Sequence, residues 1–215
     1  MAEFILDHNI EILSLSETWL SSFALPSTLN ALTPPNFVIV HQRRLTGKGG
    51  GVAFIYRSFL KMSKITLPTF TAFEALCIQI SVSSSIFKLV TIYRPPSSST
   101  SVFMQEFTSL IESLISSPSE FVITGDFNLH VDDPASPPAA SFLSVLDHFG
   151  LSQYVTFPTH RAGHTLDLLV ARTSSEMIRT VECSMPFISD HHAILSAVSI
   201  PRKTRAPRVT KTIRS

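Results

Sequence analysis

The sequence predicts an α+β fold in which two packed β-sheets are flanked by helices. Two observations support this prediction: short apolar runs of strand length recur along the chain, and only two segments place apolar residues at helical spacing. The chain has 215 residues and is 44% hydrophobic, which is enough to bury a substantial core. A sandwich of this length is commonly a single unit, so we expect residues 1–200 to form one domain.

The predicted elements follow one another along the chain. Strands are expected at residues 10–16, 37–40, 75–82, 87–93, 120–124, 166–171, 180–184 and 192–200, and within 43–57 after a glycine turn. One helix is expected over 102–116, where four apolar residues beginning with Phe103 recur at helical spacing. After a loop at 132–138, a second helix is expected over 139–149, with Gly150 as its C′ residue.

The composition excludes several classes of protein. The 17 Lys and Arg residues nearly balance the 16 Asp and Glu residues, so the overall charge does not indicate a nucleic-acid partner. Cys77 and Cys183 form neither a disulfide framework nor a Cys/His zinc motif, which favours a reducing compartment. The N-terminus lacks the basic residues of a signal peptide, and no apolar run reaches transmembrane length. We therefore expect no membrane partner and an intracellular location, in the nucleus or the cytoplasm.

Residues 201–215 differ from the rest of the chain. They carry Lys and Arg residues but no acid, together with two prolines. This composition predicts a basic disordered linker or tail. Such a segment either binds nucleic acid or is a solvated linker, and the sequence favours neither.

The stretch FVITGDFNLH at 121–130 places two polar side chains at the end of an apolar strand. Asp126 and Asn128 are two residues apart, so in an extended chain they point to the same side. We expect the two side chains to face one ligand together. Taken alone, an Asp in this position is more often a turn former than a ligand.

The same pattern recurs at other strand ends. Glu17 follows the run IEILSLS, and Tyr93 and Arg94 end the segment KLVTIYR. Asp167 lies within the apolar segment HTLDLLV, where an unpaired carboxylate is rare. Trp19 is either an aromatic residue on the substrate surface or, as the sequence favours, a residue that packs over the sheet edge. The segment FISDHHAIL places four polar residues before the last strand, namely Ser189, Asp190, His191 and His192.

Together these strand ends predict a pocket of carboxylates, an amide, a phenol and an imidazole. Oxygen ligands without thiols suit a hard cation, Mg²⁺ or Mn²⁺. A buried carboxylate beside an imidazole orients the ring and favours its charged form. These groups suit the hydrolysis of a phosphodiester, because a metal neutralises the phosphate and a carboxylate or imidazole takes the proton of the attacking water.

Other polar residues have simpler interpretations. Arg43 and Arg44, beside the glycine turn, either contact DNA phosphates or lie in a solvated turn. His160 and His164 flank a turn, and His130 follows the motif GDFN; these three histidines either lie near the active edge or, from the residues alone, are structural.

The order of the motifs resembles a known family. The motifs are SETWL (16–20), GGGVAFIYR (49–57), IYRPP (92–96), TGDFNLH (124–130), HTLDLLV (164–170) and SDHHAIL (189–195). This set is similar to the endonuclease/exonuclease/phosphatase superfamily over roughly residues 1–200. Within it, the motifs SETWL, YRPP and PTHRAGHTLDL resemble the apurinic-type endonuclease domain of non-LTR (long interspersed element) retrotransposons.

The resemblance implies a four-layer α/β sandwich, made of mainly antiparallel sheets flanked by helices, and a single-metal phosphodiesterase. It implies that Glu17 is the metal ligand and that Asp190 lies near the metal or its water. Asp126 would position or deprotonate the attacking water, and Asn128 would hold the phosphate. Tyr93 would stabilise the transition state or the leaving group.

The resemblance also implies that His191 contacts the scissile phosphate and is oriented by Asp167. Either Asp126 or His191 is the general base. Arg94, like Arg43 and Arg44, is a candidate for binding the substrate.

The chain departs from the family pattern at its start. Members open with a strand carrying an Asn metal ligand and then a helix, whereas only about nine residues precede IEILSLS here. Asn9 lies directly before the second strand, so it is not that ligand. We therefore expect the first strand to be missing and this chain to be weakly active or inactive.

The predicted function is a Mg²⁺-dependent DNA endonuclease that nicks one strand and leaves a 3′ hydroxyl. In the resembled elements this hydroxyl primes reverse transcription, so a reverse transcriptase domain is the expected partner in a longer polyprotein. Two alternatives stay open. One is another phosphodiesterase on the same scaffold, acting on an inositol phosphate or on sphingomyelin. The other is a catalytically weakened retrotransposon remnant or a DNA-binding module.

Overall fold

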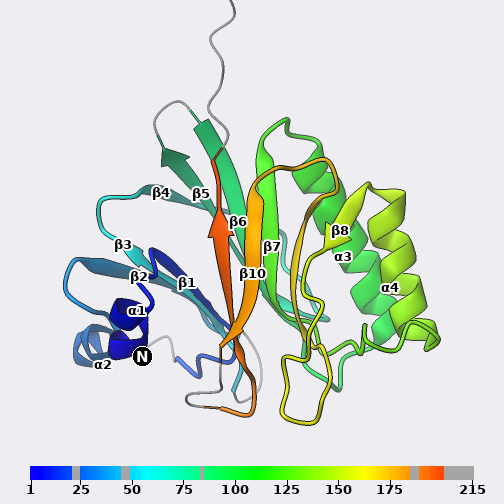
Figure 1. Ribbon diagram of the computed structural model, residues 1–215, viewed down its shortest axis with the longest axis horizontal. Coiled ribbons are helices and arrows are strands. Elements are labelled where there is room, and N and C mark those ends of the chain that lie inside the picture. Colours follow the sequence, from blue (N-terminus) through cyan, green and yellow to red (C-terminus); the bar gives the residue numbers. More distant parts are fainter. Residues whose placement is uncertain (21–24, 45–48, 83–84, 185–188, 201–215) are drawn as a thin grey trace, which may run out of the picture.

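The computed structural model describes residues 1–20, 25–44, 49–82, 85–184 and 189–200. Within these ranges the chain forms three β-sheets and four helices (Figure 1). The predicted linker at 201–215 lies outside the described residues. No helix in the described ranges is both long enough and apolar enough to cross a membrane.

The largest sheet has six strands in the order β4-β5-β6-β7-β9-β8. Its strands are β4 (Lys61–Ile65), β5 (Glu74–Val82), β6 (Ser85–Tyr93), β7 (Glu120–Asp126), β8 (Leu151–Gln153) and β9 (Asp167–Arg172). All neighbours are antiparallel except β6 and β7, which are parallel because a helix connects them. The four central strands confirm the predicted ones. The edge strands β4 and β8 were not predicted, because β4 is mostly polar and β8 has only three residues.

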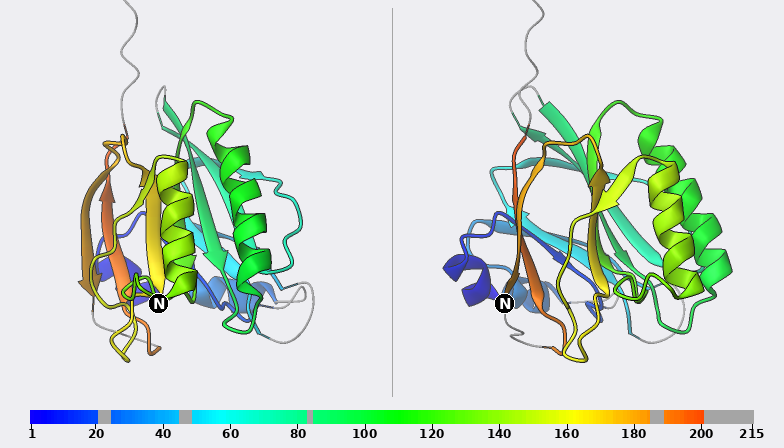
Figure 2. Two further views of the ribbon diagram at one scale, coloured as in Figure 1. Left: turned by 90° about the vertical axis from the view of Figure 1, so that its right-hand side faces the viewer. Right: turned by 45° about the vertical axis from the view of Figure 1, so that its right-hand side comes forward.

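The other two sheets are smaller. One has the order β1-β3-β2 and consists of β1 (Ile12–Leu15), β2 (Phe37–Gln42) and β3 (Val52–Arg57). The other is a ribbon of β10 (Ile178–Ser184) and β11 (Ala193–Val198). Both pack on the same face of the six-stranded sheet, where Phe54, Ile78 and Val122 belong to one buried cluster (Figure 2).

The helices α3 (Thr100–Ile115) and α4 (Pro137–His148) cover the opposite face of the six-stranded sheet (Figure 2). Their core is aromatic: Phe103, Phe107 and Phe142 stack on one another and meet Phe127 edge-to-face. Each of these rings is fully buried, and burying a Phe side chain contributes about 1.5–3 kcal/mol to the free energy of folding. This burial fixes the two helices on the sheet.

The helix α4 begins two residues earlier than predicted. Pro137 occupies its first turn, where the missing N–H of proline costs nothing, and Ser136 caps it by accepting from the Ala139 N–H at 3.4 Å. The expected loop at 132–138 is therefore shorter than predicted.

Two short helices lie beyond the three-stranded sheet, α1 (Ala2–Asp7) and α2 (Pro26–Leu32) (Figure 1). The helix α1 buries Ile5 against Phe37 and Ile55 on the outer face of that sheet. The layers are thus helices, six-stranded sheet, smaller sheets and helices. This arrangement confirms the predicted α/β sandwich of mainly antiparallel sheets.

Candidate active site

Four polar side chains form one row across the six-stranded sheet. The strand register places Glu74 opposite Tyr93, Tyr93 opposite Asp126, and Asp126 opposite Asp167. Residues directly opposite each other on neighbouring strands have their side chains on the same face. Strand pairing therefore brings together three of the predicted site residues, which are far apart in the sequence.

Gly125 allows β6 and β7 to approach closely just before this row. It has a φ of +129°, and a β-carbon here would lie 2.0 Å from the Ile92 carbonyl oxygen. Only glycine fits such a position. The glycine of the GDFN motif is therefore required for the close packing of β6 against β7, and this packing places Asp126 in the row.

His191 is hydrogen-bonded to Asp167, as the resemblance implies. Its Nδ1 lies 2.7 Å from the Asp167 Oδ2. This hydrogen bond raises the pKa of His191 to about 9 despite the opposing effect of burial, and the charges of Asp167 and Asp126 contribute further. The imidazole is therefore charged at neutral pH.

Thr159 positions both members of this pair and was not predicted from the sequence. Its buried hydroxyl accepts from the backbone N–H groups of Leu166 and Asp167, each at 3.0 Å. Its carbonyl accepts from the His192 N–H at 2.7 Å. No sequence spacing identifies a buried threonine with such a role, although Thr159 does lie within the motif PTHRAGHTLDL.

Asp126 is only 4% exposed. Burial, and then the charge of Asp167, raise the pKa of Asp126 to about 7, against the opposing effects of His191 and the Asn128 N–H. The Asn128 side chain donates from Nδ2 to Asp126 Oδ2 at 2.9 Å and to the Arg94 carbonyl at 2.8 Å. Because both amide hydrogens of Asn128 are used in this way, a contact with a phosphate oxygen requires that one of them be released.

Arg94 supports the loop that carries Asn128. Its side chain is 3% exposed and donates to the carbonyls of Asn128 at 2.9 Å and Ser98 at 2.8 Å, and to Thr100 Oγ1 at 3.1 Å. These contacts favour a positioning role over the expected contact with the substrate.

Glu17 follows β1 in a left-handed conformation, with a φ of 50° that is unusual for a non-glycine residue. Strained backbone of this kind clusters at functional sites, and Asn128 has a similar φ of 47°. The Tyr93 hydroxyl donates to Glu17 Oε1. Burial, and then this hydrogen bond, raise the pKa of Tyr93.

The glycine run 49–51 holds the segment after Glu17. Gly51 and Gly50 accept from the N–H groups of Thr18 and Trp19 at 3.1 and 2.8 Å. Trp19 is nevertheless 69% exposed, so the expectation that it packs over the sheet edge is wrong.

Glu74 organises the same region and was not predicted. Its carboxylate accepts from Arg44 Nε and from the Gly51 N–H. The Arg44 guanidinium also lies 5.5 Å from the centre of the Tyr93 ring. Arg44 is thus engaged within the protein, whereas Arg43 is exposed.

Asp190 faces His160. Its Oδ2 lies 3.3 Å from His160 Nε2, and its side chain is 43% exposed. A backbone N–H and then the His160 ring lower the pKa of Asp190. His160, interpreted from the residues as structural, thus lies beside His191, with the two ring centroids 4.9 Å apart.

A single cleft of about 1190 Å³ collects the candidate residues. Its lining includes Glu17, Asp126, Asn128, Asp167, Asp190 and His191. Tyr93 reaches this set through its hydrogen bond to Glu17. The rest of the cleft runs between β1 and β11, over an apolar floor that includes Leu89 and Leu169. The structure therefore brings the predicted residues to one rim.

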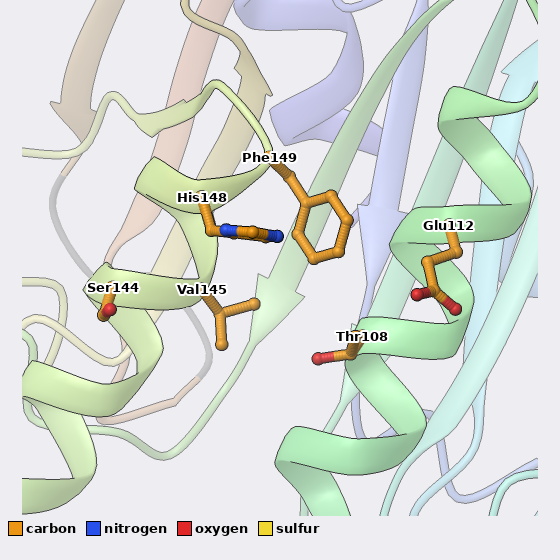
Figure 3. A pocket seen from close by; sticks show the side chains of 6 residues that line it. All are labelled: Thr108, Glu112, Ser144, Val145, His148 and Phe149. Atoms are coloured by element: carbon orange, nitrogen blue, oxygen red, sulfur yellow. The ribbon is translucent and has the colours of Figure 1, made fainter.

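A second, shallower groove of about 410 Å³ lies between α3 and α4 on the other side of the sheet (Figure 3). Its lining consists of Thr108, Glu112, Ser144, Val145, His148 and Phe149, and it contains no candidate residue.

The residues of the cleft fit a divalent cation. Asp126 and Asp167 place carboxylate oxygens within 4.8 Å of each other, and Glu17 lines the same cleft. Glu17 and Asp167 both raise the pKa of Asp126 through their charge, so the cleft holds uncompensated negative charge that a cation would neutralise. The donors are mainly oxygen atoms, which suit Mg²⁺ or Mn²⁺.

Comparison with known proteins agrees with this geometry. A sequence profile of the Endonuclease/Exonuclease/phosphatase family matches residues 1–191. A search of curated protein sequences finds no significant match.

Three solved structures illustrate the shared fold. The endonuclease domain of TRAS1, a telomere-specific non-LTR retrotransposon, is 13% identical, with a TM-score of 0.71 over 90% of this chain and 87% of that one. The AP endonuclease LMAP from Leishmania major is 15% identical, with a TM-score of 0.68 over 91% of this chain and 80% of that one. The 3′ phosphatase NExo from Neisseria, bound to a product DNA hairpin, is 17% identical, with a TM-score of 0.65 over 92% of each chain. With the fold, the residue row and the profile match in agreement, this chain belongs to the endonuclease/exonuclease/phosphatase family.

Proposed function

We propose that the chain is a metal-dependent phosphodiesterase that nicks one strand of DNA. The observation that carries this proposal is the pair of Asp167 and His191, 2.7 Å apart, in the same cleft as Asp126 and Glu17. A charged imidazole beside a carboxylate-rich, cation-binding cleft is suited to a substrate with a phosphate diester.

Glu17 is the proposed metal ligand, and Asp190 is proposed to lie near the metal or its water. Both residues line the cleft, and the left-handed backbone at Glu17 points to a side chain held for function. Mg²⁺ or Mn²⁺, when bound, neutralises the charge of the phosphate.

Asp126 is the proposed general base. A base works best when its pKa lies near the working pH, and the pKa of Asp126 is raised to about 7. The pKa of His191 is raised to about 9, so the protonated form of its ring is favoured at that pH and the ring is less suited to accept a proton. The two candidate bases therefore have different proposed roles: Asp126 accepts the proton, and His191 contacts a phosphate oxygen.

Asn128 and Tyr93 complete the proposed site. Asn128 holds the Asp126 carboxylate through its amide and its backbone N–H, so it positions the base, and it is proposed to contact the phosphate as well. Tyr93 is proposed to stabilise the transition state or the leaving oxygen through its hydroxyl. In the structure this hydroxyl donates to the Glu17 carboxylate.

DNA is the proposed substrate, and Arg43 is the proposed backbone contact because it is exposed near the glycine turn. Two of the similar structures, an endonuclease domain of a retrotransposon and a phosphatase bound to a DNA hairpin, have nucleic-acid roles of their own. Together with the motifs SETWL and YRPP, they support an endonuclease of the retrotransposon type that produces a 3′ hydroxyl for a reverse transcriptase.

The test is nicking of supercoiled plasmid in Mg²⁺. We expect weak nicking by the unmodified chain, no nicking in EDTA, and a loss of at least about 100-fold in Asp126→Ala and His191→Ala. His148→Ala, which changes an exposed histidine on α4, is the matched control. Release of inositol phosphate or phosphocholine without nicking would favour the lipid-type alternatives, and DNA binding without turnover would favour a weakened remnant.

A further inference from the structure

A second cluster of metal-binding side chains lies outside the cleft. His130 and Asp132 belong to the loop after β7, and His164 belongs to the loop before β9; both loops lie at the lower edge of the sheet in Figure 1. One ligand atom from each of the three lies within 4.8 Å of the others. His164 Nδ1 is 3.0 Å from Asp132 Oδ2, and the His130 and His164 ring centroids are 4.1 Å apart.

We propose that His130, Asp132 and His164 form a transition-metal site for Zn²⁺ or an ion with similar preferences. Two imidazoles and one carboxylate are a donor set that suits Zn²⁺. The cleft is instead rich in oxygen donors and suits Mg²⁺. Three protein ligands leave the fourth position of a tetrahedral ion open to water.

Two of the three ligands are held in place by the backbone. The second oxygen of Asp132, Oδ1, accepts from the Thr165 N–H at 2.9 Å. The His164 carbonyl accepts from the N–H groups of Thr159 and His160 at 2.9 and 3.0 Å. Outer contacts of this kind orient metal ligands and strengthen the binding of the ion.

The cluster needs little rearrangement to hold an ion. With Zn–ligand distances of 2.0–2.1 Å, neighbouring atoms in a tetrahedral site lie about 3.3 Å apart. Asp132 Oδ2 and His164 Nδ1 are already 3.0 Å apart through a hydrogen bond, so the ion takes the place of the shared proton, which is released to solvent, while the His130 ring comes closer. His130 is exposed, and its side chain can rotate without displacing the core.

An ion at this position joins two loops that border the cleft. Asn128 precedes His130 on one loop, and Asp167 follows His164 at the start of β9. Binding therefore restrains the separation of these loops, and it stabilises the folded protein because the unfolded chain does not assemble the three ligands.

The test is calorimetric titration of the metal-free protein with Zn²⁺ in excess Mg²⁺, with Co²⁺ absorption as a second readout. We expect one Zn²⁺ equivalent whose affinity falls at least about 100-fold in His130→Ala and in His164→Ala, since even loss of an outer partner costs 10–100-fold. His148→Ala is expected to bind as the unmodified chain does. His191→Ala is expected to bind one Zn²⁺ equivalent as before, which would show that the ion does not bind in the cleft.

The melting temperature provides the second measurement. Zn²⁺ is expected to raise it in the unmodified chain and in His148→Ala, but not in His130→Ala. Because His130 is exposed, its replacement tests the ligand without threatening the fold. Unchanged Zn²⁺ affinity in both His130→Ala and His164→Ala, or the absence of a tight equivalent in the unmodified chain, would overturn the proposal.

Discussion

Replacing Asp167 by Asn is expected to lower the pKa of His191 from about 9 to about 7.5. The hydrogen bond from His191 to Asp167 is the largest cause of the raised value of about 9, against an ordinary value near 6.5. A full return to the ordinary value would correspond to about 3.4 kcal/mol. We discount this to about 2 kcal/mol, because the two side chains are 28% and 15% exposed and solvent screens part of the charge.

The consequence for activity depends on pH. At pH 8 the protonated fraction of His191 should fall from about 0.9 to about 0.2 in Asp167→Asn, so nicking should fall about fourfold. Lowering the pH to 6 protonates the ring in both proteins, so the activity of the variant relative to the unmodified chain should recover.

The assay is a pH titration of the histidine ring protons by NMR in EDTA, paired with nicking rates at both pH values. Asp132→Asn is the matched control, because it removes the carboxylate beside His164 and should leave His191 unchanged. A pKa of His191 that stays near 9 in Asp167→Asn would refute the reasoning.

Three further predictions concern the fold and the substrate. Gly125→Ala should cost on the order of 4 kcal/mol or prevent folding, measured by urea denaturation, because its β-carbon would lie 2.0 Å from the Ile92 carbonyl oxygen; a loss below 1 kcal/mol would contradict this. Trp19→Ala should weaken DNA binding about tenfold by fluorescence anisotropy, without a change in melting temperature, because the ring is 69% exposed beside Glu17 and base stacking contributes 1–3 kcal/mol; unchanged affinity would argue against a DNA contact. In EDTA the protein should lose stability as the pH rises from 5 to 9. The raised pKa of Asp126 means that its contribution to stability is fully present below about pH 4 and is lost as the pH rises through 7. The corresponding contribution of His191 is lost between about pH 6.5 and 9. Mg²⁺ should therefore raise the melting temperature more at pH 8 than at pH 6, and an equal effect at both would contradict the assignment.

Much of the site was predictable because its residues lie at the ends of apolar strands: Glu17 and Asp126 at the end of β1 and β7, and Asp167 and His191 at or before the start of β9 and β11. Asp126 and Asp167 stand opposite each other, and a carboxylate in an apolar run needs a partner wherever it lies. The sequence could not show which strands pair. The pairing of the strands was not needed for this prediction, because the ends of neighbouring strands meet at one edge of a sheet in many topologies.

The roles of the supporting residues were not predictable: Arg94 was expected to contact the substrate, and Glu74 and Thr159 were not singled out. Arg94, Glu74 and Thr159 act through hydrogen bonds to backbone groups and side chains distant in the sequence. No spacing rule identifies such contacts, since they depend on tertiary structure. The same limit applies to α2 and β8, which are too short to show a periodic pattern.

Crystals of the protein soaked in Mn²⁺ test the central claim most directly. Anomalous scattering locates the ion without reference to activity. The proposed site predicts one strong peak in the cleft, bound to the Glu17 carboxylate and near Asp126, that disappears in Glu17→Gln. A cleft without a peak, or an ion that keeps its place in Glu17→Gln, would contradict the account.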